Sequence, residues 1–381
     1  MSKPRVVIPI RQEDYKLRFL QENLLRDGSI DLSSSSIDNI LKEIPHEKPL
    51  TKLLHSEVRY EVTDHCNASC IMCPRDEHEH GRAHGIMDQG KYEKSIDEVV
   101  KLGAKQIVLT GFGEPMLDKN LELKIAYAKK NNLLTYIITN GSVLTSKRAK
   151  NILLSGLDEM RVSFYGMGKD TYNKVMQGLD FERTRDGLLK FIELRNSLKV
   201  KTKIQISYLT LPENEKDEQK FKEFWEPLVD AIEIWRPHNF GDGRDYRDRE
   251  DQEKLQDKVT CGRPSTGALQ IQWDGEVIPC CYDYNNKIIL GNAFEQPVLT
   301  ILNEKKYRLL RYAHNKGLFG LFPYCDQCDQ LLPHADALVY TNRHNLPAEE
   351  AVKLSNTDLY NLSEGEDIKV ESLNESYKVE R

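Results

Sequence analysis

The stretch Cys66-Asn-Ala-Ser-Cys70-Ile-Met-Cys73 places three cysteines in a Cys-x3-Cys-x2-Cys frame. It closely follows Val58-Arg-Tyr-Glu-Val-Thr63, in which apolar and polar side chains alternate, and this alternation predicts a β-strand. The cysteines therefore lie on a loop at the C-terminal end of that strand. A 4Fe–4S cluster usually takes four thiolates. Three thiolates this close together can hold such a cluster and leave one iron open to a ligand that is not protein.

A glycine-containing turn, Gly111-Phe-Gly-Glu-Pro115, follows the next predicted strand. The cysteine frame, the strand before it and this turn together resemble the radical S-adenosylmethionine (radical SAM) enzymes. The resemblance implies that SAM chelates the open iron and that the reduced cluster cleaves SAM to methionine and a 5′-deoxyadenosyl radical, which takes a hydrogen atom from a substrate. The alternatives are a structural zinc site, with His65 or His78 as the fourth ligand, or a disulfide pair and a spare thiol.

The bulk composition narrows the class of protein. The chain has 381 residues, a length that predicts one large domain and a smaller one. Acidic residues outnumber basic ones by 60 to 54, which gives no sign of a nucleic-acid-binding face. No apolar run approaches the length of a membrane span, and the run within residues 1–10 is too short for a signal peptide. We therefore expect a cytoplasmic protein, in which eight cysteines act as metal ligands rather than disulfide partners.

From residue 58 onward, strand patterns alternate with helix patterns. The predicted strands are residues 58–63, 106–110, 134–139, 159–164, 201–208 and 231–235. Such alternation predicts an α/β fold with parallel strands joined by right-handed crossovers. Six units resemble the partial (β/α)6 barrel of the radical SAM family. In parallel barrels the chemistry sits at the C-terminal ends of the strands.

The chain divides into five expected segments. These are an N-terminal extension (1–55), the radical SAM barrel (56–240), a charged linker that could cover the active site (241–260), a small α+β domain (261–332) and a polar C-terminal tail (333–381).

The resemblance implies a SAM site around the glycine turn. It assigns contact with the methionine amino group to Gly113 and Glu114, and Phe112 stands where the family usually has glycine. Met72 precedes the third cysteine and either packs against adenine through its polarizable thioether or simply fixes the loop.

Two further residues follow predicted strands. Ser163 matches the position that reaches the ribose or the methionine carboxylate, and Asn140 faces substrate or SAM, although both residue types also cap helices. A histidine-rich loop with His78, His80 and His84 comes after Cys73, and we interpret it as an exposed polar loop rather than a second metal site.

The remaining cysteines form a second group. Asp274-Gly275 between apolar runs predicts a hairpin that brings Cys280 towards Cys261. A Cys-x2-Cys pair follows a predicted helix over residues 301–315. The four thiolates that complete a site are Cys261, Cys280, Cys325 and Cys328, and Cys281 is a spare. This stretch resembles the twitch domain, a shortened SPASM domain, which implies one auxiliary 4Fe–4S cluster. The alternative is a zinc ribbon.

A fully ligated cluster has no iron open to substrate, so its available role is redox. The cysteine layout is similar to that of radical SAM dehydrogenases that oxidise an aminocyclitol alcohol, with the second electron passing to the auxiliary cluster. Arg236, His238 and Arg244 are the candidate bases. The partners implied are a small polyol, sugar or aminocyclitol and an electron donor such as flavodoxin or ferredoxin. The alternatives are a maturase that modifies a ribosomally made peptide, and a non-catalytic iron–sulfur or zinc scaffold.

Overall fold

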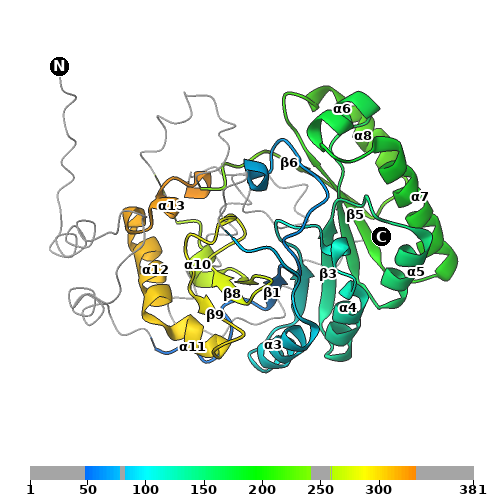
Figure 1. Cartoon of the computed structure of the whole chain (residues 1–381). Helices are drawn as coiled ribbons and strands as arrows, with labels where there is room; N and C mark the ends of the chain where they lie inside the picture. Colours follow the sequence, from blue (N-terminus) through cyan, green and yellow to red (C-terminus); the bar gives the residue numbers. More distant parts are fainter. Residues whose placement is uncertain (1–47, 78–81, 242–257, 259, 332–381) are drawn as a thin grey trace, which may run out of the picture.

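The computed structural model describes residues 48–77, 82–241, 258 and 260–331 (Figure 1). The expected N-terminal extension up to residue 47, nearly all of the linker and the tail from 332 lie outside the described residues. So do three residues singled out above, His78, His80 and Arg244.

Six parallel strands form the larger part of the sheet, as predicted. They are β1 (Glu57–Tyr60), β2 (Gln106–Leu109), β3 (Leu134–Thr139), β4 (Glu159–Ser163), β5 (Lys203–Leu209) and β6 (Ala231–Trp235). Each pairs in parallel with the next in chain order, so all six C-terminal ends meet at one edge of the sheet. The protein is an α/β fold with a parallel sheet and a smaller C-terminal part that contains antiparallel strands.

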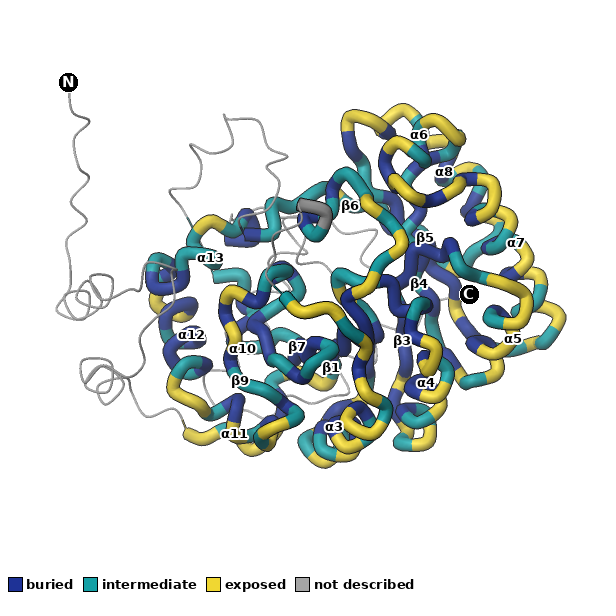
Figure 2. Tube along the Cα trace, in the orientation of Figure 1, coloured by how far each residue is buried: buried dark blue, intermediate teal, exposed yellow. Residues whose placement is uncertain are grey.

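Helices connect the parallel strands. They are α3 (Gln89–Lys101), α4 (Leu121–Lys130), α5 (Ser146–Leu154), α6 (Lys169–Val175), α7 (Phe181–Leu198) and α8 (Glu218–Trp225). Asp88 caps α3 by accepting a hydrogen bond from the backbone N–H of Lys91, and Asp180 caps α7 in the same way from Arg183. Figure 2 shows that these helices bury one face against the sheet and expose the other. Among the described residues, no helix is long and apolar enough to cross a membrane.

The C-terminal part continues the same sheet instead of forming a separate one. Its elements are α10 (Arg263–Thr266), β7 (Leu269–Ile271), β8 (Glu276–Ile278), β9 (Gly291–Asn292), α11 (Val298–Asn303), α12 (Lys305–Lys316) and α13 (Pro323–Asp326). β7 pairs in parallel with β1, and β8 and β9 follow antiparallel. The sheet order among the described residues is therefore β6-β5-β4-β3-β2-β1-β7-β8-β9.

Two predicted elements differ from the structure by more than two residues at an end. The first strand ends at Tyr60 rather than at 63, because the chain beyond it leaves β2 and turns towards a returning segment, where Thr63 bridges Ile86. The helix predicted over 301–315 is two helices, since Glu304 is extended with a ψ of 152° and interrupts the turn between α11 and α12.

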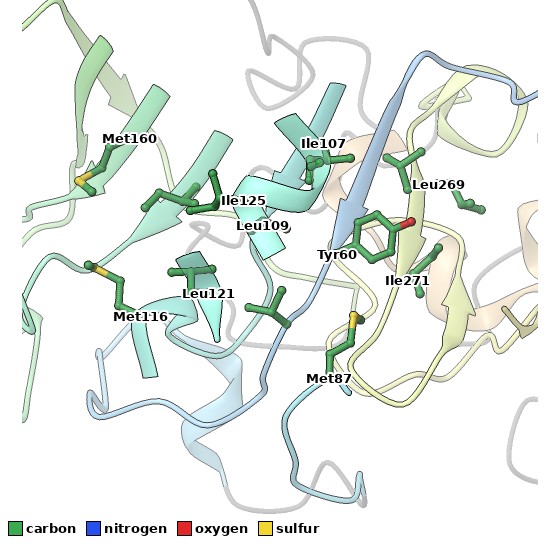
Figure 3. Packing of buried hydrophobic residues seen from close by; sticks show 14 of the residues in the cluster. Tyr60, Met87, Ile107, Leu109, Met116, Leu121, Ile125, Met160, Leu269 and Ile271 are labelled. Atoms are coloured by element: carbon green, nitrogen blue, oxygen red, sulfur yellow. The ribbon is translucent and has the colours of Figure 1, made fainter. Parts of the chain in front are cut away.

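One hydrophobic core runs beneath both parts. Figure 3 shows Tyr60, Leu109, Leu269 and Ile271 among its labelled side chains, and all four are buried. The Tyr60 hydroxyl is 2.8 Å from Ser95 Oγ, so the polar end of this ring is satisfied inside the core. Because β1 contributes to the packing on both sides, the two cysteine groups are carried on one continuous framework.

Candidate active site

The loops after β1 and β2 meet in close backbone contact. The backbone N–H of Glu114 donates a 2.8 Å hydrogen bond to the carbonyl oxygen of His65. A Cβ atom on Gly113 would lie 2.1 Å from the carbonyl oxygen of Thr63. Glycine is therefore required at 113 because no side chain fits between the glycine turn and the loop that leads to the cysteines.

The Glu114 side chain lies inside the protein and is 2% exposed. Its Oε1 accepts hydrogen bonds from the Met116 N–H (3.0 Å) and Thr139 Oγ1 (2.6 Å), and its Oε2 accepts one from the Asn140 N–H (2.7 Å). Burial raises the pKa of this carboxyl, and the three hydrogen bonds oppose that rise. The sequence interpretation gave this carboxylate to an ammonium group. The structure uses it to hold the turn after β2 against the end of β3, which leaves the backbone edge of the turn for a ligand.

The cysteine loop is held from two sides. Asn67 Oδ1 accepts a 3.1 Å hydrogen bond from Asn140 Nδ2, and Asn67 Nδ2 donates to Ser142 Oγ at 2.8 Å. On the other side, the Ser69 N–H donates to the carbonyl oxygen of Gln177 at 2.8 Å. Asn140, expected to face SAM or substrate, thus has a structural contact that positions the loop.

The three cysteines of this loop suit a cluster. None of the chain's eight cysteines, all of which are described, forms a disulfide. The Cys73 N–H donates to the carbonyl oxygen of Cys70 at 2.9 Å, which forms a tight turn between them. Burial raises the pKa of the Cys66 thiol and so disfavours its thiolate. A nearby positive group such as a cluster's iron would stabilise that thiolate. Met72 is buried in the hydrophobic core, and its contact with adenine stays a prediction.

Tyr165, which the sequence analysis did not single out, lies beside the same loop. Burial raises its pKa to about 12, a hydrogen bond with the Ser163 side chain opposes this, and the sulfurs of Cys70 and Cys73 add to the rise. Ser163 at the end of β4 therefore lies near the cysteine loop, and its side chain forms a hydrogen bond with Tyr165. A tyrosine two residues beyond a strand carries no signal of its own, because only the fold brings it to the cysteines.

The second cysteine group is gathered from three segments. Its members are Cys261 before α10, Cys280 after β8, and Cys325 and Cys328 around α13. Burial raises the pKa of Cys280 and of Cys325, and repulsion from the other sulfurs of the group raises both further. Four cysteine sulfurs that repel one another as thiolates are a donor set whose charge an iron–sulfur core or a zinc ion would neutralise.

Aromatic rings join the two cysteine groups. The Phe112 ring in the glycine turn is 5.9 Å from both Phe240 and Tyr284. The Tyr324 hydroxyl, one residue before Cys325, donates to the carbonyl oxygen of Tyr282 at 2.7 Å. Phe112, at the position where the expected pattern had glycine, is thus part of the contact between the two sites.

Comparison with protein families agrees with this pairing of sites. A model of the radical SAM superfamily matches residues 60–224, and a model of the SPASM iron–sulfur cluster-binding domain matches residues 261–329. The chain belongs to the radical SAM superfamily. It is a radical SAM enzyme with a C-terminal SPASM domain, and the family implies a SAM-binding cluster, SAM and an auxiliary cluster.

Curated relatives of this radical SAM chain differ in how much of it they match. The S-adenosyl-L-methionine-dependent 2-deoxy-scyllo-inosamine dehydrogenase of Niallia circulans is 24% identical over 286 residues, which is 73% of this chain and 94% of that protein. A probable GTP 3′,8-cyclase of Methanococcus maripaludis is 28% identical over 138 residues, which is 36% of this chain. The chain spans only 45% of the length of that cyclase.

Solved structures show the same fold. The complex of BtrN with AdoMet and 2-DOIA has a TM-score of 0.50 at 21% identity and covers 73% of this chain and 94% of its own. Streptococcus suis SuiB bound to precursor peptide SuiA has a TM-score of 0.57 at 15% identity and covers 78% of this chain and 77% of its own.

Arg236 and His238, the two base candidates that the structure describes, have contacts on other elements. Arg236 is 55% exposed and faces Glu218 of α8 at 3.5 Å. The His238 ring is 5.4 Å from Tyr282, beside the second cysteine group. The described residues offer a different arrangement at the end of β1. Asp64 Oδ2 is 2.6 Å from Nδ1 of His84, whose side chain is half exposed.

Asp64, in the loop before Cys66, pairs with His84, which follows Cys73 in the chain. The Gly85 N–H donates to Asp64 Oδ1 at 2.8 Å, and the His65 ring stacks on His84 with centroids 5.9 Å apart. One ligand atom from each of Asp64, His65 and His84 lies within 4.8 Å of the others, so the group could also hold a metal ion. A carboxylate on Nδ1 orients an imidazole for proton transfer. The sequence analysis placed His84 in a polar loop because its partner is twenty residues earlier in the chain.

Proposed function

We propose that this radical SAM enzyme oxidises a secondary alcohol of a small polyol, sugar or aminocyclitol to a ketone. The observation that carries the proposal is the second cysteine group. It has four cysteine sulfurs, enough to ligate a whole cluster, and therefore no position left open for substrate, so its available role is to accept an electron. The full-length match to the 2-deoxy-scyllo-inosamine dehydrogenase supports the same reaction class.

Oxidation of a secondary alcohol to a ketone removes two protons and two electrons from the substrate. The alcohol carbon loses one hydrogen atom, its hydroxyl loses a proton, and one further electron leaves to give the ketone. When bound, the first cluster and SAM supply the hydrogen-atom abstraction. In the proposal Cys66, Cys70 and Cys73 hold that cluster.

The proton needs a separate acceptor. We assign it to the imidazole of His84, because the Asp64 carboxylate on Nδ1 orients the ring and the side chain is half exposed. Asp64 lies in the segment that leads directly into Cys66, at the edge of the sheet where the strand ends meet, and His84 lies on the segment that returns after Cys73.

The experiment compares wild type with three cysteine variants after anaerobic reconstitution. Wild type should contain about eight iron atoms per chain, the sum for two four-iron clusters. It should form 5′-deoxyadenosine and ketone in equal amounts with the correct cyclitol or aminocyclitol from a panel. Cys70→Ala should form neither product. Cys325→Ala should still cleave SAM while ketone formation is lost. Cys281→Ser is the matched control, because it removes a neighbouring thiol outside the four-sulfur group and should keep both activities.

Three outcomes contradict the proposal. Zinc in place of iron at the second group would remove the electron acceptor. Full ketone formation by Cys325→Ala would show that the second electron leaves by another route. Turnover of a peptide with no turnover of any cyclitol in the panel would assign the chain to the peptide-modifying enzymes.

A further inference from the structure

One arginine is held by all three segments that carry the second cysteine group. Arg263 lies two residues after Cys261 and begins α10. Its Nη1 donates to Gln330 Oε1 at 3.2 Å, and Gln330 lies two residues after Cys328. Its guanidinium carbon is 4.6 Å from the centroid of the Tyr282 ring, and Tyr282 lies two residues after Cys280.

These contacts place a fixed positive charge among the sulfurs. After burial, the charge of Arg263 is the largest influence on the pKa of both Cys261 and Cys280, and it lowers both. Burial lowers the pKa of the guanidinium, but Tyr282 and the sulfurs of Cys281, Cys261 and Cys280 together raise it by more, so the group stays charged. Both Tyr282 and Gln330 are buried, so water screens this charge poorly.

A fixed charge beside a redox site acts on its reduction potential. Reduction of the auxiliary site by one electron adds one negative charge to it. A nearby guanidinium stabilises that extra charge, and charge and hydrogen bonds near the sulfurs are known to set the potentials of such clusters. The effect is large where the surroundings have a low dielectric constant.

We propose that Arg263 raises the reduction potential of the auxiliary site so that it accepts the electron released when the substrate becomes a ketone. This inference rests on the proposed function, because it requires an iron–sulfur cluster on Cys261, Cys280, Cys325 and Cys328. Arg263 does not touch the reacting atoms. It acts through the charge that it holds beside the sulfurs.

The test measures the potential of the auxiliary site directly. In full-length protein, Cys66, Cys70 and Cys73 are replaced by Ala so that only the auxiliary cluster is present, and its midpoint potential is determined by a redox titration followed by electron paramagnetic resonance. Arg263→Gln removes the charge and should shift the midpoint to more negative values. Arg263→Lys keeps the charge and should stay close to the parent.

A second variant separates charge from structure. Gln330→Glu keeps Arg263 and strengthens its tether, but it places a negative charge within 3.2 Å of the guanidinium. The ion pair that forms should keep or raise the thermal stability, so a change in potential would not reflect a loosened site. The proposal predicts a negative shift here too, and this outcome can be read even if Arg263→Gln fails to fold.

The outcomes also separate this inference from the proposed function. Zinc, or no metal, at the auxiliary site of the parent overturns the proposed function and the inference with it. An iron–sulfur cluster whose midpoint is the same in the parent, Arg263→Gln and Gln330→Glu overturns the inference alone. In the otherwise unchanged enzyme, Arg263→Gln should keep SAM cleavage and form less than one ketone per 5′-deoxyadenosine, whereas Arg263→Lys should form the two in equal amounts.

Discussion

Arg82 forms an ion pair with Glu61 in which the two side chains are only 7% and 2% exposed. The pair connects both parts of the molecule. Glu61 Oε2 accepts a 3.0 Å hydrogen bond from the Phe112 N–H in the glycine turn, and Arg82 Nη1 donates to the carbonyl oxygen of Tyr284 at 3.3 Å. Burial raises the pKa of the Glu61 carboxyl, and Arg82 counteracts this rise. The SAM turn and the auxiliary domain are therefore coupled through one buried charge pair.

Replacing Arg82 with Leu should lower the free energy of unfolding by about 3–5 kcal/mol, because Glu61 stays buried without its partner. Without Arg82 the folded-state pKa of Glu61, which burial already raises, rises further, so more stability is lost as the pH rises through that folded pKa. The variant should thus lose more stability at pH 8 than at pH 5, as urea unfolding of the cluster-free protein would show. In the double variant with Glu61→Gln, much of the loss should be recovered. Equal losses in single and double variants would mean that the pair is not coupled.

A methyl group at Gly113 should disturb the first cluster site. Gly113→Ala cannot be accommodated without moving the Thr63 backbone, and overpacking of this kind costs about 1–3 kcal/mol. We expect less iron per chain after reconstitution and a loss of 5′-deoxyadenosine formation. Gly168→Ala is the control, since a Cβ atom there meets nothing within 4 Å and its φ is −150°. Matching iron contents in the two variants would rule out close packing as the reason for Gly113.

The parallel strands could be predicted from sequence because each is a local pattern. Residues 134–139 and 231–235 match β3 and β6 at both ends, since buried apolar runs bounded by turn residues are visible in the sequence itself. The parallel pairing of β7 with β1 could not be predicted, because residues about 210 apart in the chain meet there and no short pattern records such a contact. The sequence therefore predicted a second domain but not that it extends the same sheet.

The candidate site, like the fold, could be predicted from sequence only in part. Closely spaced cysteines with a glycine turn carry their own signal, whereas the partners of single polar residues depend on tertiary packing. The hydrogen bonds of Glu114 could not be predicted, because two of the three donors to its oxygens, Thr139 and Asn140, come from the end of another strand. The charge of Arg263 has meaning only once three distant segments fold around it.

Replacing His84 with Gln should slow ketone formation about 10²–10⁴-fold, the usual contribution of a positioned proton acceptor. Formation of 5′-deoxyadenosine in the absence of substrate should continue, because the first cluster is held by the three loop cysteines and not by His84. Added imidazole should restore part of the rate if the ring acts as a base. His65→Gln is the control, since it removes the neighbouring ring and leaves the Asp64–His84 hydrogen bond in place. If His65→Gln slows the reaction as much as His84→Gln and imidazole rescues neither, His84 is not the base.

His314 in α12 should make the protein less stable in mild acid. Burial lowers its pKa to about 4, and its Nε2 has no hydrogen-bond partner among the described residues. Because the folded state holds this imidazole neutral while the unfolded chain protonates it below its usual pKa of 6.5, stability is full above pH 6.5 and falls as the pH drops towards 4. The shift corresponds to about 3 kcal/mol over that range. Urea unfolding of the cluster-free His314→Leu variant should therefore lose less stability between pH 7.5 and pH 4.5 than wild type does. Curves of equal slope for the two proteins would show that His314 titrates freely in the folded state.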